Sequence, residues 1–230
     1  MARALALTAM LILSGGAAAA QTSAPMAPGL TPDQVRASET LAATLNQAAS
    51  KEQARLATFA NRPLGAAIQR SFDIYSNYML LAAQMMPEAG YSFRPTPDVR
   101  TFGDQIKHST GAHYLYCNQP GTPPGVQKAT APNLPSLTSR ADIVNALRDS
   151  ITYCDAVLAA ATESWLEETV QGLGGPSSGP VLAIRAHSFI SNVVHDADDY
   201  GTITTYLRLQ GLVPPSTALN PAARGPAAAR

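Results

Sequence analysis

The chain has 230 residues, with 16 basic and 16 acidic side chains and a formal net charge of zero at pH 7. This balance excludes the strongly basic surface that nucleic-acid binding requires. The length suits one domain with a sizeable core, and beyond the first residues no apolar stretch is long enough to cross a membrane.

Residues 1–20 have the features of a secretory signal peptide. A basic residue near the start is followed by an apolar run from Ala4 to Leu13. Ala18 and Ala20 then provide the small residues of an A-x-A cleavage site. An uncleaved membrane anchor would need about 20 continuous apolar residues, and Ser14 interrupts this run. We therefore expect cleavage near residue 20 and a periplasmic or secreted protein that keeps no membrane contact after cleavage.

The next segment, residues 21–62, is expected to be an N-terminal extension with one helix. Thr31–Gln34 offers an N-cap, a proline at the first helical position and a capping-box glutamine. Small residues dominate the apolar face of this helix, so it would bury little surface. We treat it as an addition to the core.

Helical periodicity predicts two long helices in the following part of the chain. The first covers about 64–86 and ends at Pro87–Gly90, and the second covers about 102–117 after a cap at Thr101. Residues 119–137 contain five prolines and two glycines, which exclude a regular element. This stretch is expected to be a long crossover.

Two more helices are predicted after the crossover. The third begins at a cap on Ser139 and continues toward Val170, and the last covers about 181–209. No strand pattern occurs, which predicts the all-α class. Residues 217–230 are rich in proline and alanine and have too little apolar bulk to fold, so they are expected to be a disordered tail.

The two cysteines, Cys117 and Cys154, lie on the second and third predicted helices. A long crossover allows these two helices to run parallel. Each cysteine then lies about 15 residues into its helix, so the two thiols would sit at similar heights. Export favours a disulfide, and two buried free thiols are the alternative.

A candidate metal site involves His108 on the second helix and His195 on the fourth. Asp199 follows His195 by one helical turn and projects from the same face. Two imidazoles and one carboxylate can chelate a divalent ion and leave coordination positions open. The alternative is a solvated acidic face formed by Asp196, Asp198 and Asp199.

Helical geometry sets the other histidines apart. His113 lies about 140° around the helix from His108, which predicts a surface or packing role. His187 lies about 80° off the face of His195 and two turns away, which suits a pocket wall. Asp198 lies about 60° to the other side of His195 and is a second candidate for the third ligand.

Several segments resemble the DinB-like superfamily of metal-binding proteins. Met86–Pro97, Val99–Gly103 and His108 look like the segment that joins the first two helices of that family. The likeness continues in Tyr153–Asp155, His195–Gly201, Tyr206–Arg208 and Gly211–Ser216. It covers the chain from about Leu64 to Ser216.

The resemblance implies a DinB-like four-helix bundle over residues 63–216, with a long crossover between helices two and three and the extra N-terminal helix outside it. It also implies a metal site of three ligands, usually three histidines, one on helix two and two spaced i, i+4 on helix four. His108 and His195 match two of these places. Asp199 stands at the third, where it either retunes the choice among Zn, Ni, Mn and Fe or marks a member that has lost its metal.

The function that follows from this resemblance is metal-dependent hydrolysis or thiol transfer on a small-molecule substrate that the sequence does not identify. Export disfavours cytosolic thiols as co-substrates, so hydrolysis is the simpler hypothesis. The alternative is a non-catalytic exported bundle with a binding or structural role and a weakened or lost metal site. DinB-like proteins are often dimers, so the resemblance allows a homodimer, but the sequence identifies no dimer face and leaves the oligomeric state open.

Overall fold

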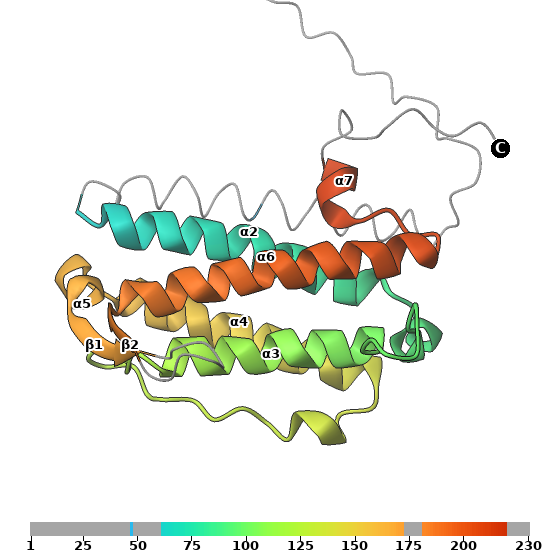
Figure 1. Cartoon of the computed structure of the whole chain (residues 1–230), viewed down its shortest axis with the longest axis horizontal. Helices are drawn as coiled ribbons and strands as arrows, with labels where there is room; N and C mark the ends of the chain where they lie inside the picture. Colours follow the sequence, from blue (N-terminus) through green and yellow to red (C-terminus); the bar gives the residue numbers. More distant parts are fainter. Residues whose placement is uncertain (1–46, 48–60, 173–180, 220–230) are drawn as a thin grey trace, which may run out of the picture.

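The computed structural model describes residues 47, 61–172 and 181–219, and these are mainly helical (Figure 1). The all-α class is therefore confirmed. The expected signal peptide, the start of the expected N-terminal helix and residues 220–230 lie outside the described residues.

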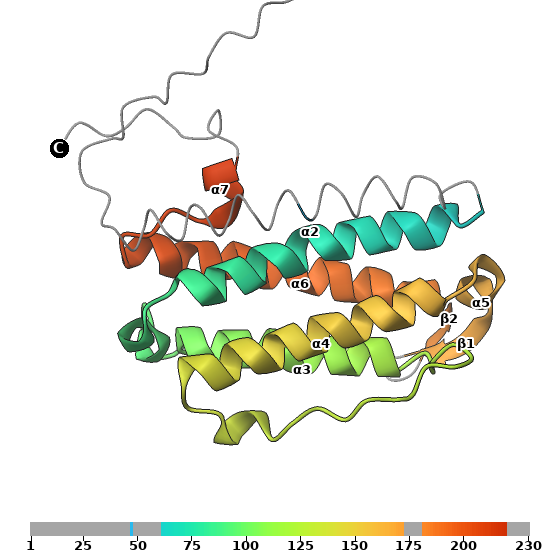
Figure 2. The ribbon, with the colours of Figure 1, turned by 180° about the vertical axis from the view of Figure 1, so that it is seen from behind.

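Four long helices form the body of the described chain: α2 (Pro63–Met85), α3 (Phe102–Asn118), α4 (Arg140–Ala160) and α6 (Ala186–Leu209). α2 packs beside α6, and α3 packs beside α4. These two pairs then face each other, with α3 against α6 and α2 against α4 (Figures 1 and 2). Every long helix thus has two long neighbours, and the four enclose one core.

The starts of α3 and α4 follow from the caps predicted in the sequence. Thr101 Oγ1 accepts a hydrogen bond from the backbone N–H of Asp104, and Ser139 Oγ accepts one from the N–H of Asp142. Each cap satisfies a backbone donor that has no partner inside its helix. The acidic side chains in these first turns also favour the positive end of the helix dipole.

The long crossover between α3 and α4 returns along the length of the bundle, so the two helices run parallel (Figures 1 and 2). It contains one short 3-10 turn, η2 (Leu134–Ser136). Parallel packing brings Cys117 and Cys154 to the same height, where they form a disulfide with their Cα atoms 5.6 Å apart. The disulfide interpretation is confirmed, and the free-thiol alternative is wrong.

The expected third helix is shorter than the sequence suggested. α4 ends at Ala160, and a separate helix, α5 (Glu163–Glu167), follows. The break occurs because Ala161 adopts an extended conformation and Thr162 caps the new helix, with its Oγ1 accepting from the N–H of Trp165.

The expectation that the chain has no strands was wrong. β1 (Thr169–Gly172) pairs with β2 (Val181–Ile184) in an antiparallel two-stranded sheet, in which Val170 lies opposite Ala183. Branched side chains in both segments favour this pairing over a helix. The last long helix therefore begins at Ala186, five residues later than predicted from Val181.

Two short elements complete the described chain. η1 (Glu88–Ser92) lies in the linker between α2 and α3. α7 (Pro215–Leu219) begins near the predicted end of the bundle and includes residues 217–219, which the sequence assigned to the disordered tail. These residues are helical because Tyr200 holds the start of α7, with its hydroxyl donating to Ser216 Oγ and accepting from the Ser216 N–H.

The core is built from the facing sides of the four long helices. Its fully buried large side chains include Phe72, Met79, Ile106, Leu147, Phe189, Ile203 and Leu207. None of the described helices is both long and apolar enough to cross a membrane.

Candidate metal centre

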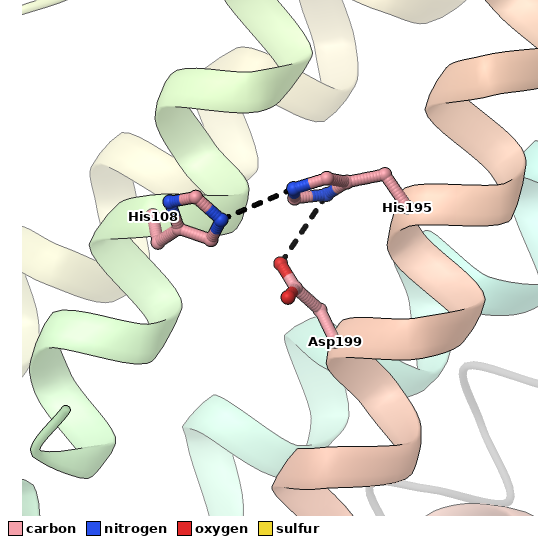
Figure 3. A group of neighbouring side chains, drawn as sticks. All are labelled: His108, His195 and Asp199. Atoms are coloured by element: carbon pink, nitrogen blue, oxygen red, sulfur yellow. Dashed lines mark hydrogen bonds and ion pairs between the residues drawn. The ribbon is translucent and has the colours of Figure 1, made fainter. Parts of the chain in front are cut away.

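The packing of α3 against α6 brings His108, His195 and Asp199 together (Figure 3). The two Nε2 atoms of the histidines lie 3.1 Å apart, and Nδ1 of His195 lies 3.3 Å from Oδ2 of Asp199. One ligand atom from each residue falls within 4.8 Å of the others. The three residues therefore form a group that can hold a metal ion.

The geometry fits a transition metal. Two nitrogens bound to one ion at about 2.1 Å lie about 3.0 to 3.4 Å apart at bond angles of about 90 to 110°, which includes the separation of the two Nε2 atoms. Nδ1 of His195 is buried and makes no hydrogen bond. Its contact with Asp199 is short enough for an ion pair but is not aligned as a hydrogen bond. Two imidazoles with a carboxylate are a donor set that Zn, Ni, Mn and Fe accept.

The Asp199 carboxylate is held by two further side chains from α3. Gln105 donates to Oδ1 at 2.7 Å, and the Ser109 hydroxyl donates to Oδ2 at 2.6 Å. All three residues are buried. Each carboxylate oxygen still has a free lone pair, so the same hydrogen bonds that fix Asp199 leave it able to meet a cation or the ring of His195.

Burial lowers the pKa of His108 below its ordinary value, and the nearby Asp199 carboxylate opposes that shift. Imidazole binds metals in its neutral form. The site thus favours the protonation state of His108 that coordination requires.

Both histidines open onto a pocket of about 700 Å³, whereas Asp199 does not line it. The ring of Tyr116 lies beside His195 with the ring centres 5.8 Å apart and also lines the pocket. A ligand in the pocket can therefore reach the two imidazoles, whereas Asp199 is the buried member of the group.

His113 also lies on α3 but is not part of the metal group. It is fully buried, with Nδ1 2.8 Å from Ser150 Oγ and Nε2 3.1 Å from Asp196 Oδ1. Of the two roles predicted for His113, the packing role is confirmed and the surface role is wrong. The combination of Ser150, His113 and Asp196 cannot act as a nucleophilic triad, because all three side chains are inaccessible to a substrate.

The structure also separates the acidic residues of α6. Asp196 and Asp199 are buried and Asp198 is exposed, so the three do not form the solvated acidic face considered above. Asp198 was predicted as a second candidate for the third ligand. This prediction was wrong, because Asp198 is exposed and is not part of the metal group. His187 is exposed, is not part of the metal group and does not line the pocket beside the two histidines; it lines a separate pocket of about 20 Å³ beside β2.

No family model matches the chain, and no curated protein matches it.

Proposed function

We propose that the protein is an exported DinB-like four-helix bundle that binds one divalent transition metal through His108, His195 and Asp199. The observation that carries this proposal is the convergence of two imidazole Nε2 atoms at 3.1 Å beside a buried carboxylate. The order and directions of the four long helices support the resemblance, as does the distribution of the group, with one member on α3 and an i, i+4 pair on α6.

The proposed activity is metal-dependent hydrolysis. A divalent ion at this site would supply a Lewis acid that activates a nucleophile near neutral pH. The protein's own contribution is orientation: Gln105 and Ser109 donate to the two oxygens of the Asp199 carboxylate and hold it next to His195. Carboxylates that bind a metal are commonly fixed by hydrogen bonds of this kind.

Export is supported by the Cys117–Cys154 disulfide, because disulfides persist mainly in oxidising compartments. Reduced low-molecular-weight thiols are scarce in such compartments. This favours hydrolysis over thiol transfer as the proposed reaction.

The proposal predicts turnover of at least one member of a panel of esters, amides and phosphoesters. Activity should require added metal, disappear in His195→Ala and persist in His187→Ala, which removes an exposed histidine outside the metal group. Initial rates are measured after removal of metal by a chelator and again after its return. Turnover that survives chelation, or that His195→Ala leaves unchanged, would contradict the hydrolase proposal.

A second candidate is a non-catalytic exported bundle. It is favoured by the hydrogen bonds that both Asp199 oxygens accept from neutral side chains. These bonds stabilise a buried carboxylate whether or not the protein catalyses a reaction. A protein that binds metal but turns over no member of the panel would support this candidate.

A further inference from the structure

The pocket next to the two histidines is large enough for a small molecule. It is lined by residues of α3 and of η2 in the crossover, together with His195 of α6. Its volume of about 700 Å³ falls within the range of about 300 to 1,000 Å³ that is usual for small-molecule sites. The pocket is therefore large enough to hold much more than the few atoms that would contact a metal.

Several of the other lining residues are apolar. They include Leu134 and Pro135 of η2 and Ala112 and Leu115 of α3. Leu115 is 50% exposed, so the protein itself leaves half of this side chain uncovered. An apolar ligand in the pocket would remove that surface from water, which is favourable.

A glycine on α3 fixes the position of the crossover wall. A Cβ atom at Gly111 would lie 3.2 Å from Cδ1 of Leu134, closer than an ordinary contact. Glycine at this position therefore lets η2 approach α3. The crossover is also tied to α3 by Lys107, whose ammonium donates to the Leu137 carbonyl at 3.4 Å.

The charges at the pocket neutralise each other. Lys107 Nζ lies 2.9 Å from Asp104 Oδ1, and its hydrogen bond to Leu137 occupies a second donor. Lys107 and Thr101 both donate to the Asp104 carboxyl and hold its pKa below the ordinary value, so this carboxylate stays ionised and paired. Apart from the proposed metal, the lining therefore has no uncompensated cation that would attract an anionic tail.

We infer that this pocket binds a molecule with an uncharged, apolar tail and an oxygen-donor head. The head contacts the metal at His108 and His195, and the tail lies against Leu115 and Leu134. This inference rests on the proposed metal site and adds a class of ligand to it, namely acyl compounds with an apolar tail of medium chain length.

Alkyl hydroxamates test the inference because the head group binds zinc and the tail can be varied. We expect the affinity of the zinc-loaded protein to rise about two- to fourfold for each methylene added between acetohydroxamate and octanohydroxamate. The lower value corresponds to partial burial of each methylene in the pocket and the upper value to full burial. Suberic acid monohydroxamate has the same length as octanohydroxamate but ends in a carboxylate, and it should bind at least tenfold more weakly. Isothermal titration calorimetry measures all three.

Two leucine variants locate the tail. Leu115→Asp should weaken octanohydroxamate at least tenfold and leave acetohydroxamate unchanged. Leu209→Asp is the matched control, because Leu209 is a similarly exposed leucine on a helix but lies outside the pocket. It should change neither affinity.

The outcomes separate this inference from the metal site. Zinc binding combined with affinities that do not depend on chain length, or with tighter binding of the carboxylate-tailed probe, would overturn the inference alone. Failure of the wild-type protein to bind zinc, nickel, manganese or iron would overturn both proposals.

Discussion

Replacing Asp196 by alanine is expected to lower the free energy of unfolding by about 1 to 3 kcal/mol, because it leaves a buried hydrogen-bonding group without its partner. Asp196 and His113 are both fully buried, and Nε2 of His113 lies 3.1 and 3.2 Å from the two carboxylate oxygens. The variant leaves the ring without its partner in a place that water cannot reach. Urea unfolding followed by circular dichroism measures the change.

The control for this experiment is Asp198→Ala, two residues further along α6. Asp198 is exposed, so its replacement should change stability by no more than about 0.5 kcal/mol. A double-mutant cycle with His113→Ala should show a coupling between His113 and Asp196 of about 0.5 to 3 kcal/mol. Equal effects of Asp196→Ala and Asp198→Ala would show that the buried pair does not stabilise the fold.

Removal of the disulfide is expected to lower the free energy of unfolding by about 2 to 4 kcal/mol. Cys117 and Cys154 are 37 residues apart, and the bond restricts the unfolded chain over that whole loop. The double variant Cys117→Ala/Cys154→Ala and the reduced wild-type protein should unfold at the same urea concentration, below that of the oxidised protein. Reductant should have no effect on the double variant. Two titratable thiols in the unreduced wild type would contradict the assignment.

The fold could be predicted where local signals decide it. Thr101 and Ser139 cap their helices through contacts with residues three positions away, so the sequence alone reveals both helix starts. The proline-rich crossover likewise predicts the parallel arrangement of α3 and α4. The end of α4 was missed because Thr162 is a cap inside a region of helical pattern, and β1 and β2 are four residues each, too short for a clear alternation.

The metal group could be predicted because helical spacing places His195 and Asp199 on one face, and the family resemblance pairs that face with His108. The residues that hold the Asp199 carboxylate could not be predicted. Gln105 and Ser109 acquire their role only through the rotation of α3 against α6, which brings them to the Asp199 carboxylate. The periodicity of a single helix does not determine that rotation.

The same limit applies to His113. Its angular separation from His108 correctly removes it from the metal group, yet nothing along α3 indicates its two partners. Ser150 comes from α4 and Asp196 from α6, so the network exists only once three helices have packed. A buried histidine of this kind is recognised from its surroundings rather than from its spacing.

The most direct test of metal binding by His108, His195 and Asp199 is elemental analysis of protein purified without chelator. We expect about one transition-metal ion per chain in the wild type and in His187→Ala, and none in His108→Ala or His195→Ala. Absence of bound metal from the wild-type protein, even after incubation with zinc, nickel or manganese, would contradict the proposed metal centre.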